Sequence, residues 1–201
     1  MISWGILGLK VVMWLGDWDM DALVARHAAD ARKELAKATT DLARCEPLAE
    51  IAKDDFRRGN ISEARQFANQ LLVIAERIRP KQERKWTYDK TRGWKFDMHS
   101  EYGIAIHDGN MVLGRIALRE GRRQEAKDYL LKAGSSPGAN TLNSFGPNMN
   151  LAKDLLQVGE RDTMVAYFHE CERFWHRQNL KSWEYDAAIG NVPDFGTNLY
   201  Y

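Results

Sequence analysis

The chain is poor in cysteine, carries almost no net charge, and has no long hydrophobic run after its first residues. It contains two cysteines in 201 residues, and 29 basic side chains nearly balance 28 acidic ones. Two cysteines far apart in the sequence form neither a disulfide framework nor a zinc site. A net charge of +1 creates no overall field that would attract nucleic acid, so we expect no nucleic-acid partner.

The common catalytic motifs are also missing. The sequence has no GxxxxGK[ST], GxGxxG, HExxH or GxSxG pattern, which would indicate phosphate, dinucleotide, zinc or acyl-transfer chemistry. His99 and His107 are weak candidates for metal ligands, because a metal site needs three or four convergent donors with supporting partners. We expect structural histidines at these positions, no cofactor, and no enzymatic activity.

Residues 1–18 form a hydrophobic N-terminal segment. The first sixteen residues are almost all apolar, with Lys10 in the middle. A membrane span needs roughly 20 apolar residues, which is longer than this stretch. We expect the segment to pack on the protein body in a cytoplasmic protein. The alternative is a membrane-associated protein in which residues 1–16 contact the bilayer surface and Trp4 and Trp14 lie at the interface.

Helical periodicity dominates the rest of the chain. A helix is predicted to begin near Met20 and to run without a glycine or proline as far as Cys45, with Pro47 opening the next helix. Residues 61–80 have apolar side chains mostly three and four positions apart, which is one face of a helix. These patterns predict an all-α fold, with residues 19–201 as a single helical domain.

Residues 80–98 break this rhythm. They combine six lysines and arginines with four aromatic residues, which are Trp86, Tyr88, Trp94 and Phe96. We interpret this stretch as a connection between helical units that is partly ordered by its aromatic residues. The alternative interpretation is a surface for single-stranded nucleic acid, because bases stack on aromatic rings beside basic groups.

An internal repeat appears when the chain is aligned on Gly59, Gly121 and Gly159. Small residues recur at fixed distances from these glycines, at the points where two antiparallel helices would cross. They include Gly114 and Ala152 before the turn, and Ala64, Ala126, Ala133 and Cys171 after it. The glycine itself supplies the left-handed conformation that ends a helix. The alignment predicts three helix hairpins, at about residues 45–78, 107–138 and 145–176.

This spacing resembles the tetratricopeptide repeat. The second unit matches best, through Leu113 and Gly114, the turn at Gly121, and the alanines Ala126 and Ala133. The stretches YGIAIHDGNMVLGRIALREG, LNSFGPNMNLAKDLL and VPDFGTNL are also similar to bacterial tetratricopeptide-like proteins of unassigned function. The resemblance implies an α-α superhelix of about three repeat pairs plus an N-terminal helix, and it implies no activity.

In tetratricopeptide arrays, the first helix of each unit lines a concave groove. Carried over by position, the resemblance implies nine groove residues in this chain. They are Lys53, Arg57, Asn110, Met111, Arg115, Arg119, Asn148, Met149 and Lys153. The basic members predict a cationic strip that binds an acidic or carboxylate-bearing segment of a partner protein. The other interpretation of these residues is that they face water and pair with neighbouring carboxylates such as Asp154.

A scaffold or adaptor that binds a partner's peptide is therefore the expected function. The alternative is a structural, self-assembling subunit that uses its apolar N-terminus and aromatic ends. Seven tryptophans are many for this length, and aromatic residues are enriched in the cores of protein interfaces.

Overall fold

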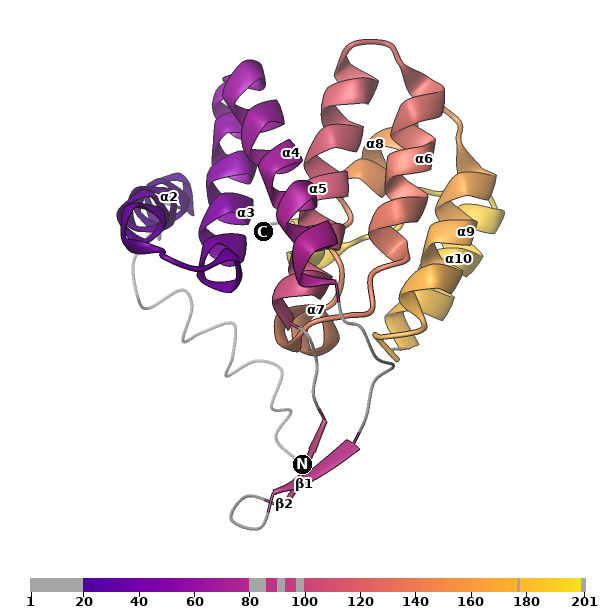
Figure 1. Cartoon of the computed structure of the whole chain (residues 1–201). Helices are drawn as coiled ribbons and strands as arrows, with labels where there is room; N and C mark the ends of the chain where they lie inside the picture. The colour runs from indigo at the N-terminus through magenta and orange to yellow at the C-terminus, as the bar shows by residue number, and fades with distance from the viewer. Residues whose placement is uncertain (1–19, 80–85, 90–92, 97–99, 177, 200–201) are drawn as a thin grey trace, which may run out of the picture.

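The computed structural model describes residues 20–79, 86–89, 93–96, 100–176 and 178–199. Nine α-helices lie in these residues (Figure 1). They are α2 (Met20–Lys37), α3 (Asp41–Arg58), α4 (Ile61–Ile78), α5 (Ser100–Arg119), α6 (Arg123–Gly134), α7 (Asn140–Phe145), α8 (Asn150–Gln157), α9 (Arg161–Cys171) and α10 (Gln178–Ala188). A short 3-10 helix, η1 (Gly196–Leu199), follows. The predicted all-α fold is confirmed.

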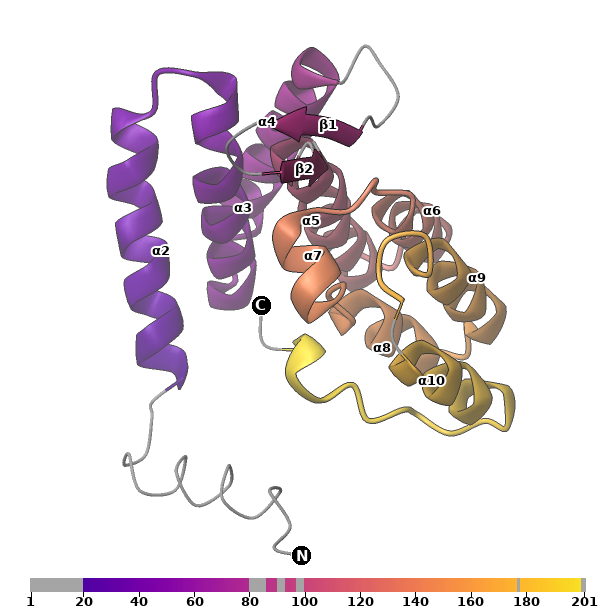
Figure 2. The same cartoon turned by 90° about the horizontal axis from the view of Figure 1, so that it is seen from below.

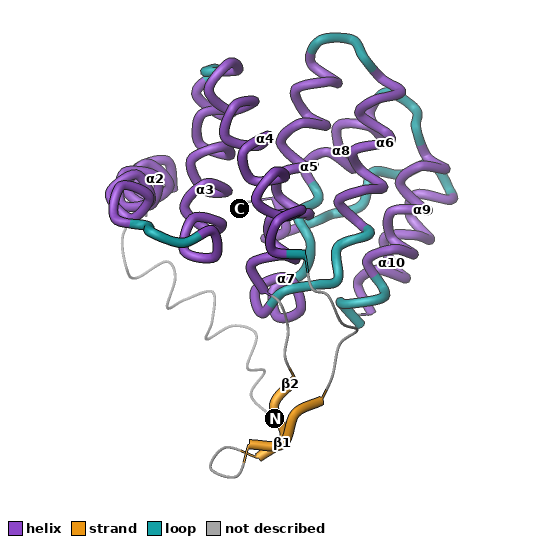
Figure 3. The backbone as a smooth tube through the Cα atoms, in the orientation of Figure 1, coloured by secondary structure: helices purple, strands orange, loops and turns teal. Residues whose placement is uncertain are grey.

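The connection between α4 and α5 contains a small β-hairpin, coloured orange in Figure 3. Strands β1 (Trp86–Asp89) and β2 (Gly93–Phe96) are antiparallel, and Trp86 pairs with Phe96. Two short aromatic runs separated by a few residues are typical of a hairpin. The rest of residues 80–98 and the hydrophobic segment 1–18 lie outside the described residues.

Three helix hairpins share the same glycine turn. Gly59 joins α3 to α4, Gly121 joins α5 to α6, and Gly159 joins α8 to α9, with φ of 82°, 77° and 90°. In each turn the glycine N–H donates to the carbonyl three residues earlier, and the next N–H donates to the carbonyl five residues earlier. This pair of bonds is the Schellman motif, which needs a left-handed residue and so favours glycine. The three predicted turn glycines are confirmed.

The hairpins stack so that their first helices meet on one side. Helix α5 contacts both α3 and α8, while α6 contacts α9; α2 packs on α3 and α10 packs on α9 (Figures 1 and 2). Gly114 marks the predicted close crossing of α5 and α6. A Cβ atom there would lie 3.0 Å from Tyr129 Cβ on α6 and 2.3 Å from Leu151 Cδ2 on α8. The small residue therefore permits close packing within one hairpin and against the next.

The predicted unbroken helix from Met20 to Cys45 is wrong. Helix α2 ends at Lys37, and a new helix begins at Asp41 with Pro47 inside it. Thr40 caps the new helix, because its hydroxyl accepts the N–H of Ala43 at 3.2 Å. A threonine side chain offers the backbone an alternative to helical hydrogen bonds, so it can end a helical run without glycine or proline.

The C-terminal residues pack back on the helices. Phe195 is 1% exposed and lies edge-to-face on Trp183, with ring centroids 5.1 Å apart.

Both cysteines are buried, and burial raises the pKa of the Cys45 thiol to about 12. None of the helices within the described ranges has the length and apolar content that crossing a bilayer requires.

Candidate functional site

Two adjoining hollows lie along the side where α3 and α5 meet. The first has a volume of about 230 Å³ and lies between α3, α5 and α7. Its lining includes Ala49, Ile104, Leu142, Phe145, Glu46 and Glu50, and we call it the apolar hollow. The second has about 200 Å³ and lies between α3, α5, the start of α8 and the C-terminal residues. Its lining includes Lys53, Arg57, Met111, Arg115, Asn148, Asn150 and Leu199, and we call it the cationic hollow.

Lys53 and Asp108 line both hollows, so the two lie side by side with this pair between them, and we call the two hollows together the groove. The lining residues come from α3, α5, α7, the start of α8 and η1, and Figure 2 shows α3 to the left of α7, α8 and η1. The groove therefore lies on the face formed by the first helices of the three hairpins.

Five of the nine residues predicted for the groove line the cationic hollow. They are Lys53, Arg57, Met111, Arg115 and Asn148. The other four lie elsewhere. Asn110 is buried, and its side-chain amide donates to the carbonyl of Ile106 in the same helix at 2.7 Å. Met149 is fully buried, Arg119 is exposed at the end of α5, and Lys153 is half-buried on α8.

Lys53 and Asp108 form an ion pair at the centre of the groove. Lys53 Nζ lies 3.2 Å from Asp108 Oδ2 and 2.6 Å from Glu50 Oε1. Burial opposes charge on Lys53, but the charges of Asp108 and Glu50 outweigh it and raise the pKa of Lys53 above its ordinary value. Burial likewise opposes ionisation of Asp108, but Lys53 and His107 hold the pKa of that carboxyl well below its usual range. Both groups are therefore charged at neutral pH.

A chain of hydrogen bonds continues from Asp108 beneath the groove. His107 is fully buried, and its Nδ1 lies 2.7 Å from Asp108 Oδ1. An ionised carboxylate can only accept, so Nδ1 carries the proton. His107 Nε2 lies 3.3 Å from the hydroxyl of Tyr167 on α9, and this hydroxyl donates to the carbonyl of Asn148 at 2.9 Å. The network links α3, α5 and α9 to the segment before α8.

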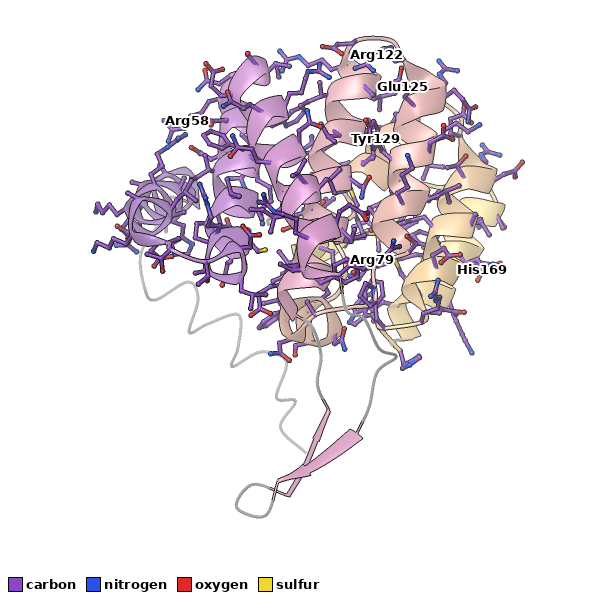
Figure 4. The ribbon with its side chains drawn as sticks, viewed as in Figure 1. Arg58, Arg79, Arg122, Glu125, Tyr129 and His169 are labelled. Carbon is purple, nitrogen blue, oxygen red and sulfur yellow. The ribbon has the colours of Figure 1, made fainter. Side chains whose placement is uncertain are left out.

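Two of the described histidines, His107 and His169, have structural partners. His107 belongs to the buried network, whereas His99 lies outside the described residues. His169, on the outer surface of α9 in Figure 4, lies 2.9 Å from Glu184 of α10. No group of three or more histidine, cysteine, aspartate or glutamate side chains within the described part of the chain is placed to hold a metal ion.

Arg115 is held in place from two sides. Its Nε donates to Asp154 Oδ2 at 3.0 Å, and its guanidinium carbon lies 4.6 Å from the centre of the Phe56 ring. The alternative interpretation, in which basic groove residues pair with neighbouring carboxylates, is therefore confirmed for Arg115. In the turn after α5, Arg122 likewise pairs with Glu120 and Glu125. Figure 4 labels Arg122 in this turn and Glu125 at the start of α6.

The far wall of the groove comes from α7 and η1, which sequence reasoning did not assign to the site. Asn198 is buried, and its amide donates to the carbonyls of Phe145 and Pro147 at 3.2 and 3.0 Å. The Asn198 carbonyl accepts the N–H of Met149 at 2.9 Å, and Asn150 donates to the Leu199 carbonyl at 3.0 Å. These bonds fix the wall between residues that are about fifty positions apart.

The lining of the two hollows combines charged, hydrogen-bonding and apolar groups. Phe145 is 70% exposed at the rim of the apolar hollow, and charged side chains lie at both ends of the groove. Comparisons with protein-family models, with curated proteins and with solved structures find no match to this chain.

Proposed function

We propose that this chain is a tetratricopeptide-like interaction scaffold whose groove binds an extended segment of a partner protein. Three hairpins with the same glycine turn and the contacts between their first helices support this family. The observation that carries the function is the pair of adjoining hollows on the face of those first helices. Each of its hollows is smaller than the roughly 300–1,000 Å³ of a typical small-molecule pocket. Side chains of a peptide suit such hollows better than an intact cofactor.

Peptides selected on the wild-type protein should lose affinity when the apolar hollow is filled. A library of random peptides displayed on phage is selected on the immobilised protein, and synthetic copies are titrated by fluorescence polarisation. Thr141 is exposed and lines the apolar hollow, so Thr141→Trp blocks it. We expect affinity to fall by a factor of about ten or more, because a filled pocket removes an anchoring contact.

Ser144→Trp is the matched control, because Ser144 is exposed on the same helix and does not line the groove. This variant should keep full affinity. Failure to select any peptide, or equal binding to both tryptophan variants, would refute the proposed groove. Circular dichroism melts verify that each variant remains folded.

Self-association is a second candidate function, supported by the outer face of α10. Tyr185 is 66% exposed and Ile189, one helical turn later, is 56% exposed; Val192 is 50% exposed. Side chains four residues apart lie on one helix face, so Tyr185 and Ile189 form a small apolar patch. If this patch binds a second copy, the sedimentation coefficient rises with protein concentration and Ile189→Lys abolishes the rise. A concentration-independent monomer contradicts this role.

A further inference from the structure

We infer that the groove selects a dipolar segment, with a lysine or arginine in the apolar hollow and an acidic side chain two residues away in the cationic hollow. This inference rests on the proposed peptide-binding function and specifies its ligand. It follows from the opposite charges of the two hollows, the apolar walls beside the carboxylates, and the distance between the hollows.

The two hollows carry opposite net charges. Glu46, Glu50 and Asp108 line the apolar hollow against the single cation Lys53, which leaves two negative charges. Lys53, Arg57 and Arg115 line the cationic hollow together with the anion Asp108, and Asp154 pairs with Arg115 beside it, which leaves one positive charge. Lys53 and Asp108 belong to both hollows and neutralise each other. The difference therefore comes from the glutamates at one end of the groove and the arginines at the other.

Helix α3 alone already presents this change of sign. Glu46, Glu50, Lys53 and Arg57 are three or four positions apart, so they share one helix face that runs along the groove. Glu50 is bound to Lys53, but Glu46 is exposed and has no ion-pair partner among the described residues. Glu46 is thus available to a ligand at the negative end.

The apolar hollow suits a long cationic side chain. Lysine and arginine pack their aliphatic stems on apolar surface while the charged head stays at the rim. Here Ile104 and Leu142 offer apolar walls, and Glu46 lies at the rim. The exposed ring of Phe145 adds a surface over which a cation is attracted. A neutral apolar side chain would fill the hollow and leave Glu46 without a partner.

The cationic hollow suits a carboxylate. Asp154 and the Phe56 ring hold the Arg115 guanidinium at this hollow, so little side-chain freedom is lost when a ligand binds. Asn150, on the opposite wall, is held by its bond to the Leu199 carbonyl. An acidic side chain that enters here meets the positioned Arg115 guanidinium, whereas Asn150 already donates both of its amide hydrogens, to Asn148 Oδ1 and to the Leu199 carbonyl.

The spacing of the two charges follows from the geometry of α3. Its lining residues are 46–53 in the apolar hollow and 53–57 in the cationic hollow. The midpoints of these sets are about five and a half residues apart, or about 8 Å at 1.5 Å per residue. In an extended peptide, side chains on the same side repeat every second residue, about 7 Å apart. Charges two residues apart therefore reach both hollows from one side of the peptide.

The test uses four end-capped peptides that differ only in the identity or spacing of two charged residues. Three have the patterns Lys-x-Glu, Glu-x-Glu and Lys-x-Lys. In the fourth, five residues separate the lysine from the glutamate. Fluorescence polarisation on the full chain should give Lys-x-Glu the highest affinity, by a factor of about ten, because a reversed charge replaces attraction by repulsion. Glu46→Lys should then prefer Glu-x-Glu, and Arg57→Glu should prefer Lys-x-Lys. Arg119→Glu, outside both hollows, should leave the ranking unchanged.

Equal affinities for the four peptides, or a ranking that Glu46→Lys and Arg57→Glu do not alter, would overturn the dipolar ligand. The result is separable from the proposed function. If library-selected peptides still lose affinity on Thr141→Trp, the groove binds peptides of another chemistry and only this inference fails. If neither peptide set responds to Thr141→Trp, the peptide-binding groove itself is rejected.

Discussion

Replacing Lys53 with methionine is expected to lower the free energy of unfolding by about 3–5 kcal/mol, because removal of one partner strands a buried charge. The stranded group is Asp108, whose remaining neighbour in the network is His107. Urea unfolding followed by circular dichroism measures the loss. The double variant Lys53→Met/Asp108→Asn should recover most of it, since the asparagine carries no charge. Equal losses in the single and double variants would show that the Asp108 charge does not cause the effect.

The same ion pair gives the protein an alkaline dependence of stability. The pKa of Lys53 is raised above its ordinary value of 10.5 in the folded state, so folding favours the protonated amine. Its contribution is fully present below the unfolded pKa and is lost as the pH rises through the folded one. The difference in unfolding free energy between the wild type and Lys53→Met should therefore be constant near neutral pH and shrink above about pH 10.5.

Replacing Gly103 with alanine is expected to cost about 3 kcal/mol or more, which is the upper range for overpacking. A Cβ atom at this position would lie 1.8 Å from the carbonyl oxygen of Gly138, a backbone atom that no rotamer change can move. Ser136 keeps the Gly138 loop close to helix α5, because its hydroxyl donates to the Gly103 carbonyl at 2.8 Å. Helix α5 and the loop before α7 must therefore separate to admit a methyl group.

Gly114→Ala is the matched control in the same helix. A Cβ atom at position 114 would lie 2.3 Å from Leu151 Cδ2, which is the end of a flexible side chain. The higher helix propensity of alanine offsets about 1 kcal/mol of the cost of this contact. Thermal unfolding should therefore show a clearly larger fall in Tm for Gly103→Ala than for Gly114→Ala. A larger fall for Gly114→Ala would contradict the importance of the backbone contact at Gly103.

The parts of the fold that depend on local sequence could be predicted. Gly59, Gly121 and Gly159 could be predicted because the turn that ends each helix needs a residue with positive φ at that one position. The spacing of the apolar residues predicted the helices between these turns. The break after Lys37 was missed because it depends on a side-chain cap at Thr40 rather than on a breaker residue.

The site could be predicted only where one helix face determined it. Met111 and Arg115 are one turn apart on α5, and both line the cationic hollow. Asn110, next to Met111, is turned about 100° away by the helix, and its amide donates to the Ile106 carbonyl. The wall made by Phe145 and Leu199 depends on the hydrogen bonds of Asn198, which join segments about fifty residues apart. The spacing of residues within one helix does not indicate contacts between segments so far apart in the sequence.

The buried network beneath the groove has a consequence for how the stack unfolds. Repeat stacks usually lose structure one unit at a time, since each repeat contacts only its neighbours. Here Lys53 of the first hairpin, His107 of the second and Tyr167 of the third belong to one chain of polar contacts. Opening one hairpin would leave a charged group or a hydrogen-bond donor of the other two without its partner in the protein interior. The three hairpins should therefore melt as one cooperative unit, and the groove keeps its shape until that unit is lost.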